Sequence, residues 1–272
     1  MGWGAIQDSR RQDMAETKTA IANKPTWVDL ATTDAAAARD FYSKVFGWKI
    51  EVNPDPQYGG YGMAEVGGKR VAGIGPKMSP DAPTAWSIYI ATDDADALAK
   101  KAQAAGGTVV APPFDVGDQG RMAAIQDPSG AVISVWQAGA MNSAMPVGEA
   151  NTFGWAELSA RGVDKAIPFY QKVFGWTPKA NDMGPDQPPY TEFQLSGESV
   201  AGAQEMQSMV PAQVPSNWLA YFTVADVDKS FKAATQAGAR ELVAPMDFPG
   251  GRFAIVSDPQ GASFGLLKMA PR

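Results

Sequence analysis

Two tryptophan–carboxylate pairs are the candidate chemistry of this sequence. Trp27 is followed two residues later by Asp29, and Trp155 is followed in the same way by Glu157. Both pairs lie in short apolar stretches typical of β-strands, where residues two apart point to the same face. An indole offers a flat apolar surface, and a carboxylate beside it attracts a cation or a hydrogen-bond donor. The spacing favours a site for a flat organic molecule, neutral or cationic.

The same residues also have a purely structural interpretation. Large aromatic side chains mostly pack in cores, whereas Asp and Glu are unusual inside apolar strands unless they are exposed or paired. The carboxylates therefore carry more of the functional argument than the tryptophans. A solvated sheet face would also accommodate Asp29 and Glu157, so both interpretations stay open at this point.

The sequence contains neither histidine nor cysteine. Histidine is the commonest general base and the commonest transition-metal ligand. Without either residue, a zinc, nickel or iron site would have only carboxylate and amide ligands, which suit these metals poorly. Ser-His and Cys-His nucleophile pairs are excluded in the same way. We expect no metal ion and no other cofactor.

Two arginines occupy equivalent places in the two halves of the chain. Arg121 and Arg252 each follow a glycine. They are candidates to bind an anionic group of a ligand or to pair with Asp29 and Glu157. A surface salt bridge, which contributes little to stability, is the alternative that we favour.

The elements that position these residues occur twice. Residues 41–48 read FYSKVFGW and residues 169–176 read FYQKVFGW, and the triplet VAG and the turn DPxG also recur in the same order. An ordered series of this kind indicates a tandem duplication of a whole domain. The duplication predicts an N-terminal tail at 1–24, a first domain at 25–139, a linker at 140–150 and a second domain at 151–272.

Each predicted domain contains two modules of the same type. Apolar periodicity predicts a strand at 26–30 and a helix at 35–46, which ends at the Phe-Gly-Trp of the repeat. Three further strands follow, and the order β-α-β-β-β begins again near residue 86. A short sheet with a helix on one face leaves its other face free. We therefore predict an α+β fold in which the two paired modules of each domain form a curled mixed sheet around a cleft.

The composition of the chain excludes some classes of binding partner. The chain has 272 residues, 45% of them hydrophobic, and a formal net charge of −6. This charge and the lack of a basic cluster argue against nucleic acid as a partner. No apolar run reaches the length of a membrane span, and the N-terminus has no signal-peptide core. We expect a cytoplasmic protein whose partner is a small-molecule ligand, either as a homodimer or as a monomer with paired internal domains.

The sequence resembles a known family in several motifs. The paired β-α-β-β-β modules, FYxKVFGW, the Gly-Gly after the second helix and the DPxG turn before the last strand are similar to the vicinal oxygen chelate superfamily. That superfamily includes glyoxalases, bleomycin-resistance proteins and extradiol dioxygenases. The resemblance covers residues 25–272 and implies tandem domains of this fold. It does not by itself define a function, because the superfamily hosts many chemistries and pure binders.

Catalytic members of the superfamily bind a metal ion in the cleft, and the resemblance implies where the ligands would lie. The first-strand ligand falls on Trp27 and Trp155. The remaining mapped positions are Ser87, Leu219, Ser134, Gly265, residues 71–74 and residues 200–203. None of these is a good metal ligand, and Gln204 and Glu205 lie just beyond the last of them. The resemblance therefore implies the fold and argues against metal chemistry.

If Trp27 and Trp155 occupy ligand positions, they face the clefts, and Asp29 and Glu157 share that face. By the same alternation three further aromatic residues join them: Tyr89, Trp136 and Tyr221. Trp86 and Trp218 alternate out of phase and are expected under the helices.

We therefore predict a metal-independent small-molecule-binding protein of the glyoxalase/bleomycin-resistance fold, which sequesters a drug, a metabolite or a natural product. The first alternative is a metal-free enzyme of hydroxylase, lyase or isomerase type, in which Asp29 or Glu157 is the general base. A metal-dependent glyoxalase or dioxygenase is the less favoured alternative. The predicted ligand-binding residues are Trp27, Tyr89, Arg121, Trp136, Trp155, Tyr221 and Arg252.

Overall fold

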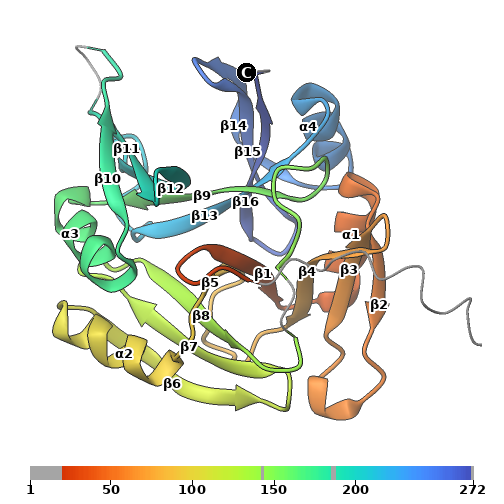
Figure 1. The fold of residues 1–272 in the computed structure, drawn as a ribbon. Helices are drawn as coiled ribbons and strands as arrows, with labels where there is room; N and C mark the ends of the chain where they lie inside the picture. Colours follow the sequence, from red (N-terminus) through yellow and green to blue (C-terminus); the bar gives the residue numbers. More distant parts are fainter. Residues whose placement is uncertain (1–19, 142–143, 185–187, 271–272) are drawn as a thin grey trace, which may run out of the picture.

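The computed structural model describes residues 20–141, 144–184 and 188–270, which fold into four successive β-α-β-β-β modules (Figure 1). The first domain consists of β1 (Pro25–Thr32), α1 (Ala35–Phe46), β2 (Lys49–Val52), the 3-10 turn η1 (Pro56–Tyr58), β3 (Gly62–Val66), β4 (Lys69–Pro76), β5 (Ala85–Ala91), α2 (Ala95–Ala104), β6 (Thr108–Val116), β7 (Gly120–Gln126) and β8 (Val132–Ala138). The second domain consists of β9 (Phe153–Ala160), α3 (Val163–Phe174), β10 (Thr177–Asn181), β11 (Tyr190–Leu195), β12 (Glu198–Glu205), β13 (Asn217–Thr223), α4 (Val227–Gln236), β14 (Arg240–Phe248), β15 (Gly251–Ser257) and β16 (Ser263–Met269).

Each pair of modules forms one eight-stranded mixed sheet. The strand order is β2-β3-β4-β1-β5-β8-β7-β6 in the first domain and β10-β11-β12-β9-β13-β16-β15-β14 in the second. Within a module the first and last strands pair in parallel, and the first strands of the two modules pair antiparallel at the centre of the sheet. The predicted α+β fold, with two paired modules in each domain, is confirmed.

The repeated motif ends its helix as the sequence predicts. Asp34 caps the N-terminus of α1 by accepting a hydrogen bond from the backbone of Ala37. Gly47 and Gly175 follow α1 and α3 with φ of 68° and 70°, in the left-handed region where a Cβ would be strained. The backbone then turns into the next strand after Trp48 or Trp176.

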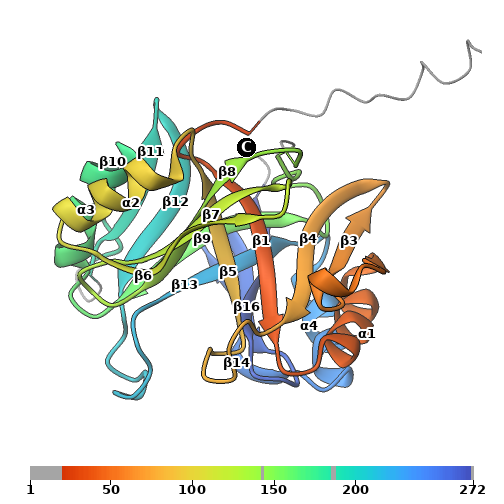
Figure 2. The same ribbon diagram turned by 90° about the horizontal axis from the view of Figure 1, so that it is seen from below.

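The helices of the two domains pack against one another in pairs. α1 lies beside α4 and α2 beside α3, which Figures 1 and 2 show from two directions. Under α1, the Trp86 indole donates to the Tyr42 hydroxyl at 2.9 Å, and this hydroxyl donates to Asp258 of the other domain at 3.0 Å. The equivalent interactions under α3 run through Trp218, Tyr170 and Asp127. The repeated motif therefore joins the domains, and Trp86 and Trp218 lie under helices as predicted.

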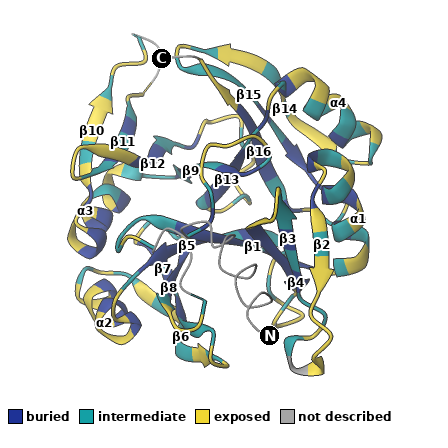
Figure 3. Ribbon diagram, turned by 45° about the vertical axis from the view of Figure 1, so that its right-hand side comes forward, coloured by how far each residue is buried: buried dark blue, intermediate teal, exposed yellow. Residues whose placement is uncertain are grey.

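Burial follows the layered arrangement (Figure 3). The central strands are largely buried, whereas the edge strands β2, β6, β10 and β14 expose much of their length. Among the described residues, no helix has the length and apolar character needed to cross a lipid bilayer. The apolar core thus lies mainly between the two sheets, around the paired helices. The opposite face of each sheet carries no helix.

Candidate functional site

The candidate site lies on the face of each sheet that carries no helix, which we call the helix-free face. Trp86 of β5 contacts Tyr42 of α1, so its side chain points to the helices. Trp27 and Asp29 of β1 pair with residues of β5 that alternate with Trp86. Because successive strand residues point to opposite faces, Trp27, Asp29 and Tyr89 project from the helix-free face.

In the first domain these side chains form a carboxylate cluster of Trp27, Asp29, Tyr61 and Tyr89. The Trp27 indole donates to Asp29 Oδ1 at 2.7 Å, and the Tyr61 hydroxyl donates to the same oxygen. The Tyr61 hydroxyl also accepts from the Trp27 indole at 3.3 Å. Tyr89 is the cross-strand partner of Trp27, and its hydroxyl donates to the sulfur of Met122 at 4.0 Å. The predicted tryptophan–carboxylate pair is therefore held by the phenol of Tyr61.

The second domain repeats this arrangement as a carboxylate cluster of Trp155, Glu157, Tyr190, Gln204 and Tyr221. Glu157 Oε1 accepts from the Tyr221 hydroxyl at 2.9 Å and from Gln204 Nε2 at 2.8 Å. Glu157 Oε2 accepts from the Tyr190 hydroxyl at 3.0 Å, and the Trp155 indole donates to that hydroxyl at 2.8 Å. The longer Glu side chain thus gains an amide donor that Asp29 lacks.

A glycine makes room for the phenol in each cluster. An added Cβ would lie 1.7 Å from the Tyr61 hydroxyl oxygen at Gly73, and 1.9 Å from the Tyr190 hydroxyl oxygen at Gly202. Gly73 pairs with Asp29 and Gly202 with Glu157 on the adjacent strand. The recurring VAG triplet therefore provides the strand position over which the phenol reaches the carboxylate.

Burial dominates the electrostatics of both clusters. Desolvation raises the pKa of Asp29 and of Glu157, and the hydrogen bonds that each carboxylate accepts offset only part of this effect. The pKa values of Tyr61, Tyr89 and Tyr221 are raised well above the ordinary range, first by burial and then by the neighbouring carboxylate. The phenols are therefore neutral hydrogen-bond donors, and the carboxylates hold a proton more readily than they would in water.

Of the other residues predicted from the sequence, Trp136 adjoins the first cluster, whereas the two arginines form ion pairs away from both carboxylates. Trp136 packs edge-on against Tyr89, with ring centroids 6.4 Å apart. Arg121 pairs with Asp96 and Asp115, both on its own domain. In the second domain, Arg252 forms the same pairs with Asp228 and Asp247. Both arginines thus form the surface salt bridges that the sequence analysis favoured, rather than pairs with Asp29 or Glu157.

Three members of the clusters were not predicted: Tyr61, Tyr190 and Gln204. Tyr61 and Tyr190 are equivalent residues that recur at the same offset as the VAG triplet, which is the signal that identifies them in retrospect. Gln204 lies two residues beyond Gly202 on β12 and was noted only as a neighbour of the mapped metal positions. Its role depends on the Glu157 side chain of the adjacent strand.

The apolar surroundings of the two clusters differ. In the first domain Trp27, Tyr89 and Trp136 are only 5–8% exposed and belong to the main core. In the second domain a separate apolar cluster lines the helix-free face, and several of its members are half-buried. It consists of Leu219, Tyr221, Leu267, Trp155, Phe248, Phe253 and Ile255. The second domain thus presents a more accessible aromatic surface.

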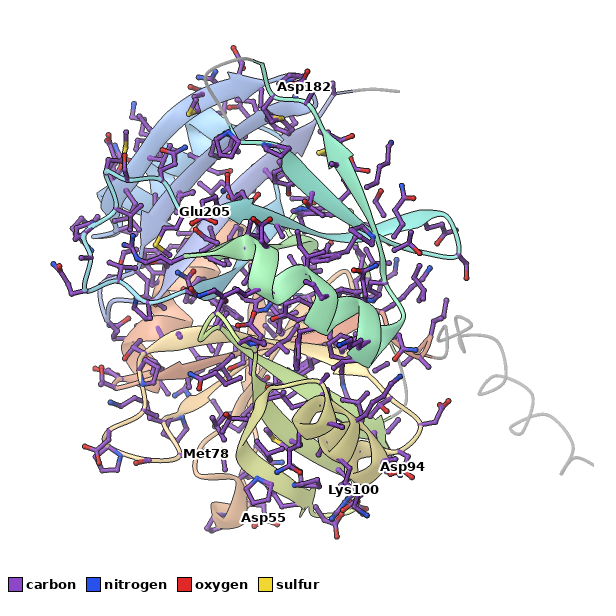
Figure 4. The ribbon with its side chains drawn as sticks, turned by 90° about the vertical axis from the view of Figure 1, so that its left-hand side faces the viewer. Asp55, Met78, Asp94, Lys100, Asp182 and Glu205 are labelled. Carbon is purple, nitrogen blue, oxygen red and sulfur yellow. The ribbon has the colours of Figure 1, made fainter. Side chains whose placement is uncertain are left out.

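A small pocket adjoins the second cluster. Its volume is about 40 Å³, and it is lined by Met183, Pro188, Tyr190, Gln204, Glu205 and Gln207. Glu205, labelled in Figure 4, accepts hydrogen bonds from the backbone of Gly162 and Val163 at the start of α3. The pocket has room for a small polar group but not for a ring system, which would instead lie on the aromatic surface.

The side chains of the helix-free face do not fit a transition-metal ion. The mapped ligand positions on β5 and β8 are Ser87 and Ser134, and those on β13 and β16 are Leu219 and Gly265. Across the described residues, no group of three or more His, Cys, Asp or Glu side chains is arranged to hold a metal ion. One carboxylate with neutral phenols is a poor donor set for such ions.

The chain matches the Glyoxalase/Bleomycin resistance protein/Dioxygenase superfamily over residues 24–135 and 152–266. It therefore belongs to this superfamily, and the resemblance inferred from the motifs is confirmed. In structure it is similar to the Mn(II)-bound glyoxalase from Novosphingobium aromaticivorans, with a TM-score of 0.61, 17% identity and coverage of 92% of this chain and 84% of that one. It is also similar to the 2,3-dioxygenase LapB from Pseudomonas sp. KL28, with a TM-score of 0.64, 13% identity and coverage of 94% and 96%. These similarities show the fold alone.

Relatives with higher identity extend over nearly the whole chain. A protein named putative glyoxylase CFP32, from Mycobacterium bovis and Mycobacterium tuberculosis, is 43% identical over 254 residues, which cover 91% of this chain and 95% of the relative. The anthracycline biosynthesis protein DnrV of Streptomyces peucetius is 36% identical over 259 residues, with coverage of 90% and 93%. Both alignments thus extend over the two halves of this chain.

Proposed function

We propose that the protein binds a small, flat organic molecule on the helix-free face of the second domain, with Glu157 as the polar anchor and without a metal ion. The observation that carries the proposal is the state of Glu157. This carboxylate is 9% exposed, is hydrogen-bonded only by neutral groups, and forms no ion pair with any described residue. A buried carboxylate without a cation is costly, and such groups are concentrated at functional sites.

The surroundings support a flat ligand. Trp155, Phe248 and Phe253 are half-buried on the same face, and stacking on such rings adds roughly 0.5–1.5 kcal/mol beyond burial. The names of two relatives refer to anthracycline biosynthesis and to glyoxylase activity, both of which concern small organic molecules. As a binder, the protein would sequester a drug, a metabolite or a natural product in the cytoplasm.

Quenching of tryptophan fluorescence by 9-anthracenemethanol tests this proposal. The anthracene ring absorbs where tryptophan emits, so a ring stacked on Trp155 quenches the emission strongly. We expect Trp155→Phe to lose much of the quenching and to bind more weakly, whereas the matched variant Trp27→Phe keeps both. If neither variant changes the quenching or the affinity, the ligand lies elsewhere and both tryptophans are structural.

A metal-free enzyme is the second candidate, and the raised pKa of Glu157 favours it. A carboxylate whose pKa is shifted toward neutrality is a better general base at physiological pH. Asp29 has the same property in the first domain. If Glu157 is the base, Glu157→Gln should reduce turnover about 10²-fold or more while binding survives. If the carboxylate only binds, the same change weakens affinity modestly, and mass spectrometry finds no product with either protein.

A further inference from the structure

We infer that Gln204 is a specificity-determining residue of the second domain: with Glu157 it forms an acceptor-lined edge that takes flat molecules bearing a hydroxyl or ammonium group. The inference rests on the proposed function and specifies the ligand class of that site. It follows from the hydrogen bonds of the cluster, from the charges around the pocket and from the residue that replaces Gln204 in the first domain.

The orientation of the Gln204 amide is fixed by Glu157. Gln204 Nε2 donates to Glu157 Oε1 at 2.8 Å, so the amide oxygen points away from the carboxylate. No described residue donates a hydrogen bond to this oxygen. Gln204 is half-buried and lines the pocket of about 40 Å³ beside Tyr190. A volume of this size holds a hydroxymethyl or aminomethyl group, since about 10–15 Å³ on the same measure is enough for one water molecule.

Apart from the second N–H of the Gln204 amide, the donors of the cluster are already used. The hydroxyls of Tyr190 and Tyr221 both donate to Glu157, and the Trp155 indole donates to Tyr190. The groups left for a ligand are therefore mainly acceptors, namely the Gln204 amide oxygen and the one remaining lone-pair site of Glu157. A ligand that brings its own donor hydrogen-bonds to them, whereas an ether of the same shape brings no donor and displaces the water that would otherwise pair with them.

The charged groups around the pocket favour the same class of ligand. Glu205 lines the pocket, and Glu192 lies two residues from Tyr190 on β11, so the two side chains share one face of the strand. Lys179 approaches Glu192 only to 4.0 Å and is itself largely exposed. Acidic groups therefore predominate at this edge of the site, which disfavours an anionic ligand and favours an ammonium group.

The first domain lacks this edge. Gly73 and Gly202 pair with the two carboxylates, so two residues further along the strand Gly75 is the counterpart of Gln204. An added Cβ at Gly75 would lie 2.9 Å from the ring of Tyr61, which occupies that space. The acceptor edge thus distinguishes the second domain from the first.

Four anthracenes that share one ring system test the inference: 9-anthracenemethanol, its methyl ether, 9-anthracenemethylamine and 9-anthracenecarboxylate. Their own fluorescence anisotropy reports binding to the full-length protein. We expect the alcohol and the ammonium to bind about tenfold more tightly than the ether, and the carboxylate to bind most weakly. Equal affinities of wild type for the alcohol and the ether, or a carboxylate that binds as tightly as the ammonium, would overturn the inference.

Variants separate Gln204 from the rest of the pocket. Gln204→Met should bring the ratio of alcohol to ether affinity close to one without changing the affinity for the ether. Gln194→Met, a change of the same type on β11 outside the pocket, should leave the ratio unchanged. A ratio that persists in Gln204→Met assigns the selection to another group and overturns the inference.

The same experiment distinguishes a failure of the proposed function from a failure of the inference about Gln204. If none of the four anthracenes binds, or if Trp155→Phe leaves the affinity for all of them unchanged, the proposed site is wrong and the inference falls with it. If Trp155→Phe weakens all four but the alcohol and the ether bind alike, the site stands and only the role of Gln204 is refuted.

Discussion

The two domains hold the same tryptophan, carboxylate and phenols on the same strands, but they use the space around them differently. In the first domain the aromatic residues of the helix-free face are buried in the main core, and the ring of Tyr61 fills the space above Gly75. In the second domain the corresponding face carries a separate, half-buried apolar cluster, and Gln204 borders a pocket.

This difference shows how a duplicated domain can keep the same polar network in both copies while the aromatic rings around it are packed into the core in one copy and left half-buried in the other. Asp29 and Glu157 are both raised in pKa by burial, so the electrostatics alone does not separate the copies. Access to the tryptophan does, because Trp155 is half-buried whereas Trp27 is only 5% exposed. The first cluster is therefore best understood as a structural counterpart of the second, and three changes made in parallel in both domains test this comparison.

The largest effect on stability and binding is expected from substituting Gly73 and Gly202, which lie beneath the phenols of Tyr61 and Tyr190. Gly73→Ala and Gly202→Ala place a methyl group within 2 Å of a tyrosine hydroxyl oxygen, so the phenol or the strand must move. Each change should lower the free energy of unfolding in urea by about 1–3 kcal/mol. Only Gly202→Ala should also abolish binding of 9-anthracenemethanol. Loss of binding in Gly73→Ala alone would place the working site in the first domain.

A smaller effect is expected in the pH dependence of stability. The pKa of Glu157 is raised above its ordinary value of 4.5 and that of Asp29 above 3.8, so the folded state retains protons that the unfolded state has released. The free energy of unfolding of the wild type should therefore fall as the pH rises above these ordinary values, until the folded carboxylates are ionised. Glu157→Gln and Asp29→Asn should each flatten this decline in urea titrations between about pH 4 and pH 8. Wild-type stability that rises relative to both variants over this range would contradict the raised pKa values.

The smallest effect is expected from the arginines. Arg121 and Arg252 form equivalent, partly exposed ion pairs at the surface of each domain, and such pairs contribute little. Arg121→Ala and Arg252→Ala should shift the urea midpoint slightly and by similar amounts. Neither should change the affinity for 9-anthracenemethanol or 9-anthracenecarboxylate, measured by anisotropy. A selective loss of carboxylate binding in Arg252→Ala would restore this residue as a ligand contact.

The fold could be predicted from the sequence because its signals are local or repeated. Apolar periodicity, the glycine after each FYxKVFGW helix and the ordered duplication are all visible in one chain. The tryptophan–carboxylate pairs could be placed on one face for the same reason, since alternation along a strand depends on no other part of the molecule.

The rest of the site could not be predicted, because it depends on neighbouring strands. Tyr61 and Tyr190 reach their carboxylates across glycines of a third strand, and the hydrogen bond of Gln204 depends on the register between β9 and β12. The joining of the domains by Tyr42 and Asp258 was missed for a similar reason, since these residues are far apart in sequence. Hydrophobic pattern fixes the faces of a strand but not which residues of different strands become neighbours.

The central claim is that the second domain binds a flat organic molecule without a metal ion. The most direct measurement is a calorimetric titration of 9-anthracenemethanol into protein treated with a chelator and then analysed for metal content. We predict one molecule bound per chain, with the same affinity before and after treatment, and a marked loss of affinity in Trp155→Phe but not in Trp27→Phe. Binding that disappears with the chelator and returns on addition of a divalent metal ion, or two equal sites per chain, would contradict this account.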